Sequence, residues 1–373
     1  MKTLVVTNDY PPRQGGIQTF VRAILDQFDP DDVAVYASSS PGAVEYDAQA
    51  PFETVRANTR MLLPTPAVTR EVTAMMRRIG ADRVWFGAAA PLGLMAPKLR
   101  AAGAAQLVGT THGHETGWAI TPGTRQTLRA IARGLDVTTY ITNYTRSRLA
   151  PLLAPVTTMR RLSPGVDVER FSPSVDGAPL RERFGVTDRI VIGCISRLVP
   201  RKGQDVLIEA MPAIIARHRD AALMIVGGGR YEAALRRQVV RAGLQRHVIF
   251  TGGLAYDELP SAYAACDVFA MPARTRNKGW DVEGLGMVYL EAAATGKAVI
   301  AGNSGGAPEA VRHADTGLVV QRPQSPTAVA AALNELLDNP TRAAGMGARG
   351  REWVIDEWTW NRQAGVLQEL LDG

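Results

Sequence analysis

Short apolar runs rich in β-branched residues alternate along the chain with stretches in which apolar residues recur at helical spacing. In the first half, the run LVVT is followed by a helical pattern from Ile17 to Phe28. Four more runs follow (VAVYA, RVWFGA, QLVGTT and TTYIT), with helical patterns at 67–79, 91–102, 123–134 and from 145 onward. Strands that alternate with amphipathic helices build parallel βαβ units, so this half predicts a doubly wound parallel sheet.

The same alternation starts again after residues 162–173, a segment dense in Pro, Gly and Asp that is typical of a linker. The runs IVIGCISRL, ALMIVGGG, VIFTGGL, VFAMPA, AVIAGN and GLVV predict a second parallel sheet. Helices are expected at 204–217, 231–242, 257–265, 286–295, 326–338, 341–353 and 357–371. Ligands of open α/β sheets bind beyond the carboxyl ends of the strands, so two such domains would face each other across a ligand cleft.

Composition supports a two-domain globular protein. The chain has 373 residues, of which 46% are hydrophobic and 21% charged. No apolar run reaches the ~18 residues that a membrane-spanning helix needs, and the opening MKTLVVTNDYPP is too short in apolar residues for a signal peptide. The two cysteines, Cys194 and Cys266, lie in apolar runs and are expected to be reduced core residues. These features favour a cytoplasmic location.

The excess positive charge is confined to the first half. Residues 1–165 hold 18 Lys and Arg against 12 Asp and Glu, which gives +6, whereas residues 166–373 hold 24 of each. An anionic partner would explain this asymmetry, and an Arg-rich surface without a partner would explain it equally well. Scarce lysine, no aromatic residues interleaved with the basic ones and no recognisable binding motif argue against nucleic acid.

A glycine pair follows the first strand and enters a helix. Without side chains at Gly15 and Gly16, a phosphate can approach the backbone N–H groups at a helix N-terminus. The loop matches neither the Walker pattern nor GxGxxG, and a plain tight turn is the alternative interpretation.

Two acidic residues flank the start of a predicted helix in DVEGLGMVYLEAAATG. Glu283 precedes this helix, and Glu291 lies about two turns inside it. Gly284 and Gly286 leave N–H groups open for an anion near the helix start. Two solvated surface acids are the alternative, but Glu291 interrupts an apolar segment in which a buried carboxylate would need partners.

Two basic residues, Arg197 and Lys202, lie on a strand-to-helix loop of the second half, in SRLVPRKGQD. Cations at the carboxyl end of a strand suit a diphosphate, and the neighbouring Arg201 competes for the same assignment. A solvated basic loop is the alternative.

The sequence THGHE follows a strand of the first half. His112, His114 and Glu115 do not have the spacing of a helical metal site, so hydrogen bonding by His112 is favoured over metal binding. GNSGG at 302–306 is not interpreted as a serine nucleophile because the strand–helix alternation contradicts that fold. The GGG at 227–229 is only weak evidence for nucleotide binding.

Two predicted helices of the first half are basic and amphipathic. Arg125, Arg129 and Arg133 recur every four residues on one, and Arg77 and Arg78 lie on the other. Such helices can lie on an anionic membrane, although an ordinary solvated face over a core is the alternative for each.

In combination these motifs resemble a known family. GGI, THGHE, SPGVDxxxF, SRLxxRKG, VGGG, EGLGMVYLEAAATG and GGAPEAV occur in this order over nearly the full length, as in the retaining glycosyltransferases of family four. The stretch ARTRNKGWDVEGLGMVYLEA is similar to that of the phosphatidylinositol mannosyltransferases. The resemblance implies the α/β GT-B fold: a domain at 1–164, a nucleotide-sugar domain at 165–356, and a C-terminal segment, 357–373, that crosses back onto the first.

The resemblance also implies an activity and partners. The activity is transfer of mannose from GDP-mannose to the 6-position of the inositol of phosphatidylinositol monomannoside, without a metal or other cofactor, at the cytoplasmic face of the membrane. Another lipid acceptor, a soluble sugar or inositol, or another nucleotide-sugar donor are the alternatives. A non-catalytic nucleotide-binding protein is disfavoured because the motif residues are intact.

The family motifs assign roles residue by residue. His112, Arg197, Lys202 and Glu283 would act in catalysis, and Asp9 and Tyr10 would contact the acceptor. The donor-binding residues implied are Gly16, Arg197, Lys202, Thr251, Leu254, Glu283, Gly286, Met287, Val288 and Glu291.

Overall fold

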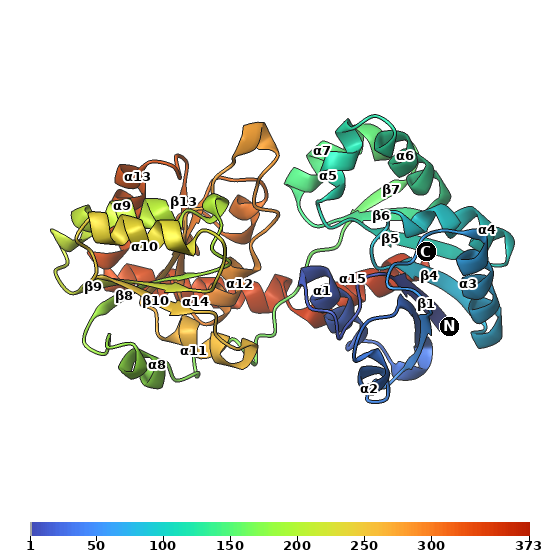
Figure 1. Ribbon diagram of the computed structural model, residues 1–373, viewed down its shortest axis with the longest axis horizontal. Helices are drawn as coiled ribbons and strands as arrows, with labels where there is room; N and C mark the ends of the chain where they lie inside the picture. The colour runs from blue at the N-terminus through green and yellow to red at the C-terminus, as the bar shows by residue number, and fades with distance from the viewer. Residues whose placement is uncertain (1) are drawn as a thin grey trace. The chain divides into compact units, whose positions relative to one another are not determined.

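The computed structural model of the chain describes residues 2–373, apart from the side chain of Lys278. It divides into two compact units, Met1–Gly165 with Trp360–Gly373, and Val166–Thr359. Each unit is built on one parallel sheet (Figure 1). The expected boundaries, after 164 and after 356, lie one and three residues from the observed ones.

The first unit contains a seven-stranded sheet in the order β3-β2-β1-β4-β5-β6-β7, with every pair parallel. The strands are β1 (Lys2–Thr7), β2 (Val33–Ser38), β3 (Glu53–Ala57), β4 (Ala81–Phe86), β5 (Gln106–Thr110), β6 (Val137–Tyr140) and β7 (Thr158–Arg161). The sequence did not predict β3 and β7, the two edge strands. An edge strand has one neighbour and tolerates exposed polar residues, so ETVRA and TMRR carry no apolar run.

Alternating side chains of β1 serve the two faces of this sheet. Leu4 and Val6 join the core beneath α3 (Pro66–Ile79), whereas Val5 joins the core beneath α1 (Gly16–Leu25) and α15 (Trp360–Asp372). The other helices of this unit are α2 (Ala43–Asp47), α4 (Ala96–Ala101), α5 (Glu115–Ile120), α6 (Thr124–Gly134) and α7 (Asn143–Leu153). The buried faces on both sides make this a doubly wound sheet.

The second unit contains a six-stranded parallel sheet in the order β10-β9-β8-β11-β12-β13. Its strands are β8 (Ile190–Ile195), β9 (Ala221–Val226), β10 (Val248–Gly252), β11 (Val268–Met271), β12 (Ala298–Gly302) and β13 (Gly317–Val320). The chain order reverses beside β8, between β8 and β11, which is where doubly wound sheets bind ligands.

Helices cover both faces of the second sheet. They are α8 (Ala178–Arg183), α9 (Gln204–Ile215), α10 (Glu232–Arg241), α11 (Leu259–Ala264), α12 (Met287–Ala294), α13 (Pro326–Leu337) and α14 (Pro340–Glu357). Helix α9 packs against α10 and α13, and the three lie together on one side of the sheet, whereas α12 packs against α14 (Figure 1). Both cysteines are free and buried, and burial raises the pKa of each thiol to about 12.

The closing helix begins later than predicted. Residues 357–371 were expected to be helical, but α14 extends to Glu357 and α15 begins at Trp360. Between them the helix is interrupted at Trp358 and Thr359, where Thr359 pairs with Val166 in a parallel bridge and the Val166 N–H donates to the Trp358 carbonyl at 2.6 Å. None of the described helices is both long and apolar enough to cross a membrane.

Candidate active site

A nearly buried ion pair lies at the carboxyl edge of the second sheet. Lys202 ends a 3₁₀ turn after β8, and Glu283 lies between β11 and α12. Lys202 Nζ is 2.7 Å from Glu283 Oε2, and the residues are 8% and 6% exposed. Arg201 Nε is 3.7 Å from the same oxygen. Thus two sequence-predicted residues are in contact, and the competing Arg201 contributes a second cation to the same carboxylate.

The backbone of Glu283 is held by the loop after β12. Its N–H donates to Ser304 Oγ at 3.3 Å, and its carbonyl accepts from the Gly306 N–H at 2.9 Å. At Gly305, where φ is +57°, a Cβ would lie 2.1 Å from the Glu283 carbonyl oxygen. The GNSGG motif, which had no role in the sequence analysis, therefore positions the predicted catalytic carboxylate.

A glycine after β9 and a buried glutamine shape the loop that carries Arg197. A Cβ at Gly227, where φ is +128°, would lie 2.2 Å from the Ser196 carbonyl oxygen. The buried Gln204 donates from Nε2 to Ser196 Oγ at 2.9 Å and to the Arg197 carbonyl at 3.1 Å. The GGG turn thus serves close backbone packing beside this loop. The Arg197 side chain is exposed and has no side-chain partner in the described part of the chain, so its role stays a prediction.

Glu291 lies inside α12, and its carboxylate has a partner that the sequence did not reveal. The hydroxyl of Tyr263, on α11, donates to Glu291 Oε2 at 2.5 Å. Burial raises the pKa of Glu291, while the Tyr263 hydrogen bond and the positive charges of Lys202 and Arg170 oppose that rise. Because Tyr263 reaches Glu291 from another helix, no local sequence signal could have paired them.

The N-terminus of α12 is open. Gly286 precedes it with φ at +88°, no side chain caps it, and its first turn has no acidic residue. Met287 and Val288 are half-buried in this turn. A Cβ at Gly286 would lie 2.4 Å from the Tyr289 ring, so packing requires glycine here. The free N–H groups can receive an anion or a sugar hydroxyl.

The end of β10 and the loop after it lie at the same edge of the sheet. Thr251 is half-buried and its hydroxyl donates to the Gly252 carbonyl at 2.8 Å. Leu254 is half-buried against the core. These contacts lie within the second unit and show nothing of a nucleobase, so the predicted base contact of the two residues stays a prediction.

In the first unit, α1 also has an uncapped N-terminus. Gly16 is its first residue and is exposed, and a Cβ added there would meet no atom within 4 Å. Asp9 is half-buried, and its Oδ1 accepts from Gln18 Nε2 at 2.8 Å. This hydrogen bond fixes the Asp9 carboxylate beside the start of α1.

The prediction of Tyr10 as an acceptor contact needs correction. Tyr10 is 1% exposed and belongs to the core, where its ring packs edge-on against Tyr46 and lies under the guanidinium of Arg56. Burial raises the pKa of its hydroxyl to about 12. The family motifs assigned Asp9 and Tyr10 the same role, but the Asp9 side chain is half-buried and that of Tyr10 is in the core.

His112 follows β5, and the structure defines its tautomer. Its Nε2 lies 2.7 Å from the Gly87 carbonyl, which can only accept, so Nε2 carries the proton. Burial lowers the pKa of His112, which favours the neutral ring, in which Nδ1 is an acceptor. Glu115 is fully buried and accepts the N–H groups of His112 and Gly113 at 3.0 and 2.9 Å. The Glu115 carboxylate thus stabilises the turn at His112 and Gly113.

Metal binding was the alternative for this segment. Among the residues whose side chains the structure describes, no three of His, Cys, Asp or Glu are placed to hold a metal ion together. His114 Nε2 lies 3.4 Å from Glu115 Oε1, and the Glu115 carboxylate also accepts from the His112 backbone N–H.

The two basic helices differ in whether their cationic side chains form ion pairs. Arg125, Arg129 and Arg133 are exposed on α6 and have no partner in the described residues, while the opposite face of α6 is buried. Arg78, on α3, forms an ion pair with Glu53 of β3 and is therefore not a free cation as predicted.

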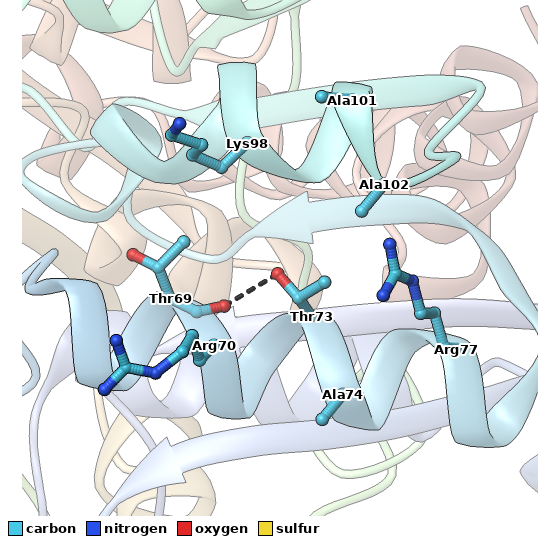
Figure 2. Close-up of a pocket in the computed structure, with 8 residues that line it drawn as sticks. All are labelled: Thr69, Arg70, Thr73, Ala74, Arg77, Lys98, Ala101 and Ala102. Carbon is cyan, nitrogen blue, oxygen red and sulfur yellow. Dashed lines mark hydrogen bonds between the residues drawn. The ribbon is translucent and has the colours of Figure 1, made fainter.

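Arg77 lines a groove of about 360 Å³ between α3 and α4, with Arg70 from the same helix and Lys98 from α4 (Figure 2). The rest of the lining is made of small residues, among them Thr73, whose hydroxyl donates to the Thr69 carbonyl at 2.7 Å. Three cations beside small residues make this groove electropositive.

Comparison with known proteins identifies the family. Residues 14–170 match the family model described as Glycosyltransferase Family 4, and residues 179–353 match Glycosyl transferases group 1. The chain is 48% identical over 375 residues to the GDP-mannose-dependent alpha-(1-6)-phosphatidylinositol monomannoside mannosyltransferase of Mycolicibacterium smegmatis, an alignment that covers 99% of this chain and 98% of the relative. The chain belongs to glycosyltransferase family 4.

Other family 4 relatives agree. The protein of the same name from Mycobacterium tuberculosis is 48% identical over 379 residues, with 100% of this chain and 98% of the relative covered. A Corynebacterium glutamicum mannosyltransferase whose name specifies the monoacylated acceptor is 48% identical over 375 residues, with 99% and 97% covered.

Solved structures give the fold of this family 4 chain. HepE from Anabaena in complex with UDP aligns with a TM-score of 0.81 and 21% identity, covering 100% of both chains. Sucrose-phosphate synthase from Thermosynechococcus elongatus aligns with a TM-score of 0.75 and 21% identity, covering 99% of this chain and 98% of its own. The fold is GT-B, as the order of motifs predicted.

Proposed function

We propose that this protein transfers mannose from GDP-mannose to the 6-position of the inositol of phosphatidylinositol monomannoside, with retention at the anomeric carbon. The observation that carries this proposal is the 48% identity, over nearly the full length, to mannosyltransferases whose names state this donor and acceptor. The contact between Lys202 and Glu283, at the sheet edge where ligands bind, supports it.

The proposed donor site neutralises the leaving diphosphate. Lys202 and Arg197 supply positive charge, and the N–H group of Gly16 meets the β-phosphate. Lys202 is already paired with Glu283, so binding exchanges that carboxylate for a phosphate oxygen. Cations and helix N-termini supply the positive charge that a metal ion would otherwise provide, and we therefore propose that transfer needs no metal.

The sugar and nucleoside have separate proposed contacts. Glu283 accepts hydrogen bonds from mannose hydroxyls, with help from the N–H groups at Gly286 and Met287. Glu291, which is oriented by Tyr263, accepts hydrogen bonds from the ribose hydroxyls. The segment from Thr251 to Leu254 contacts the guanine. In this arrangement Glu283 selects for the hydroxyls of mannose, and Glu291 selects for those of the ribose.

The acceptor is proposed to meet the first unit. Asp9 accepts a hydrogen bond from the inositol, and His112, a neutral acceptor at Nδ1, contacts the transferred sugar. Retention is explained by a front-face reaction: the bond from the anomeric carbon to the phosphate oxygen breaks, the acceptor oxygen bonds on the same face, and its proton passes to the leaving phosphate.

Transfer from labelled GDP-mannose in the presence of EDTA tests this function. Vesicles carry phosphatidylinositol in one assay and its monomannoside in the other. We expect label in the dimannoside from the monomannoside assay only. Label only in the monomannoside would reject the proposed step but not the class of enzyme. Bound GDP-mannose without a lipid product would reject the lipid acceptor, and activity lost in EDTA but restored by a divalent cation would reject metal independence.

The lipid acceptor leads to a second proposal, that the first unit rests on the anionic inner face of the plasma membrane. Arg125, Arg129 and Arg133 present one free cationic row, and the groove between α3 and α4 gathers Arg70, Arg77 and Lys98. A cation near an anionic surface contributes about 1 kcal/mol to membrane binding. The α6 arginines and the cations of the groove would therefore each add measurably to the binding free energy. Attraction between these cations and the anionic lipids would attach the protein peripherally.

Changing Arg125, Arg129 and Arg133 together to Gln is expected to lower vesicle binding at low salt by at least tenfold, since three cations are lost. Co-sedimentation with phosphatidylinositol vesicles measures it. The matched control changes three exposed arginines of α10, Arg236, Arg237 and Arg241, to Gln, which removes the same charge from the second unit. Equal losses in both variants would show that only net charge matters, and unchanged binding would exclude α6 as the contact.

A further inference from the structure

A second ion pair joins the two loops that carry Lys202 and Glu283. Asp205 lies in the first turn of α9, three residues after Lys202, and Arg274 lies after β11, on the way to Glu283. Arg274 Nη2 is 2.6 Å from Asp205 Oδ2, and both side chains are 16% exposed. We call this pair the Asp205–Arg274 bridge.

The backbone reinforces the bridge. The Arg274 N–H donates to the Arg201 carbonyl at 2.8 Å, so Arg274 contacts the β8–α9 loop on both sides of Lys202. The two loops are therefore joined through Arg274, through the contact of Lys202 with Glu283, and through Arg201. Arg201 Nη1 lies 3.5 Å from Asp281 Oδ1, and its Nε lies 3.7 Å from Glu283 Oε2.

A third loop is tied to the same carboxylate. The hydroxyl of Tyr231, which precedes α10, donates to Asp205 Oδ2 at 3.2 Å, and the Tyr231 N–H donates to the Leu198 carbonyl at 3.2 Å. Gln238 Nε2 donates to the Asp205 carbonyl at 3.0 Å. Asp205 thus connects the loops that follow β8, β9 and β11 at one edge of the sheet.

The Lys202–Glu283 contact and the Asp205–Arg274 bridge differ in what happens when a donor binds. Under the proposed function, Lys202 leaves Glu283 for the diphosphate and Glu283 turns to the sugar, so this join opens. The Asp205–Arg274 bridge has no such ligand and stays closed. Catalytic groups must be held near the productive geometry, and an error of about 1 Å can cost about a hundredfold in rate.

We propose that Asp205 and Arg274 are positioning residues that keep the phosphate-binding and sugar-binding loops in register while Lys202 and Glu283 exchange each other for the donor. The proposal rests on the proposed function of this site. It assigns the bridge a role in turnover, through Lys202 and Glu283, and none in the chemical step itself.

Asp205→Asn and Arg274→Gln, singly and together, test the proposal in the full-length protein with GDP-mannose. We expect each single variant to lower kcat about tenfold to a hundredfold, with the KM for GDP-mannose changed less than threefold, because Glu291 and the α12 N-terminus are untouched. The double variant should be no slower than the slower single variant, since both remove one interaction. Arg274→Lys should recover part of the rate.

Arg342→Gln is the matched control, because it breaks the exposed Arg342–Glu335 pair, and it should leave kcat unchanged. Thermal unfolding and GDP binding are measured alongside. A rate loss that only follows the unfolded fraction, multiplicative effects in the double variant, or unchanged kcat would each overturn the inference. If Asp205→Asn does not fold, Arg274→Lys and Arg274→Gln decide it. Wild-type protein that fails to bind or use GDP-mannose would instead overturn the proposed function.

Discussion

Replacing Lys202 by methionine is expected to lower kcat with GDP-mannose by about 10²- to 10³-fold, while donor KM changes less than tenfold. Methionine keeps the approximate length of the side chain but removes the charge that stabilises the diphosphate as it leaves. The leaving group gains most of its charge in the transition state, so the loss falls on turnover more than on binding. Steady-state transfer to monomannoside vesicles, together with calorimetric binding of GDP, separates the two quantities.

The position of Lys202 sharpens this expectation. The residue is 8% exposed and its Nζ contacts Glu283 Oε2 at 2.7 Å, and Arg201 Nε lies 3.7 Å from the same oxygen. Removing one partner of a buried pair destabilises a protein, so the melting temperature of the variant must be measured as well. Lys202→Arg, which keeps the charge, is the matched control and should retain more activity than Lys202→Met. A defect confined to KM would contradict the assigned role.

Sequence reasoning located the strands and catalytic loops because both leave local signals. The core strands β1 and β8 contain the short apolar runs LVV and IVIGCI. Lys202 and Glu283 lie in loops that follow strands, where an α/β sheet binds ligands. The order of the motifs along the chain then identified the family, which no single motif could do. The fold class and the shared location of Lys202 and Glu283 were therefore accessible without coordinates.

What the sequence missed depends on contacts between distant segments. Tyr263 reaches Glu291 from another helix, Arg274 reaches Asp205 from another loop, and Ser304 holds the backbone of Glu283 from beyond β12. The error at Tyr10 has the opposite origin: its neighbour Asp9 has a half-buried carboxylate, but one residue further the chain turns its ring into the core. Sequence adjacency does not fix the direction of a side chain in a loop.

The pairing of Arg78 with Glu53 illustrates the same limit for charge. A basic helical face predicted free cations, but Glu53 belongs to β3, an edge strand that the apolar pattern did not reveal. By contrast, α6 has no acidic residue in its first turn, and its three arginines are free in the described structure. The membrane proposal therefore depends on α6 and on the groove beside Arg77, and not on Arg78.

Glu283→Gln is expected to lower kcat/KM for GDP-mannose by about 10²- to 10³-fold, because a neutral amide replaces the carboxylate proposed to bind the mannose hydroxyls. Gln has the same shape, and Ser304 and Gly306 contact only the backbone at this position, so the loop should keep its conformation. Glu352→Gln, on an exposed surface of α14, is the matched control and should be unchanged.

Combining Glu283→Gln with Lys202→Met separates mutual neutralisation from direct action on the donor. If the two side chains act on different parts of GDP-mannose, the sugar and the diphosphate, their rate losses should multiply in the double variant. A double variant as active as the single ones would mean that each residue serves mainly to neutralise the other, and the assigned donor contacts would be wrong. Binding of GDP, which has no mannose, gives the internal check. Glu283→Gln should leave it within about threefold, while Lys202→Met weakens it more, because Lys202 is proposed to contact the diphosphate and Glu283 is not.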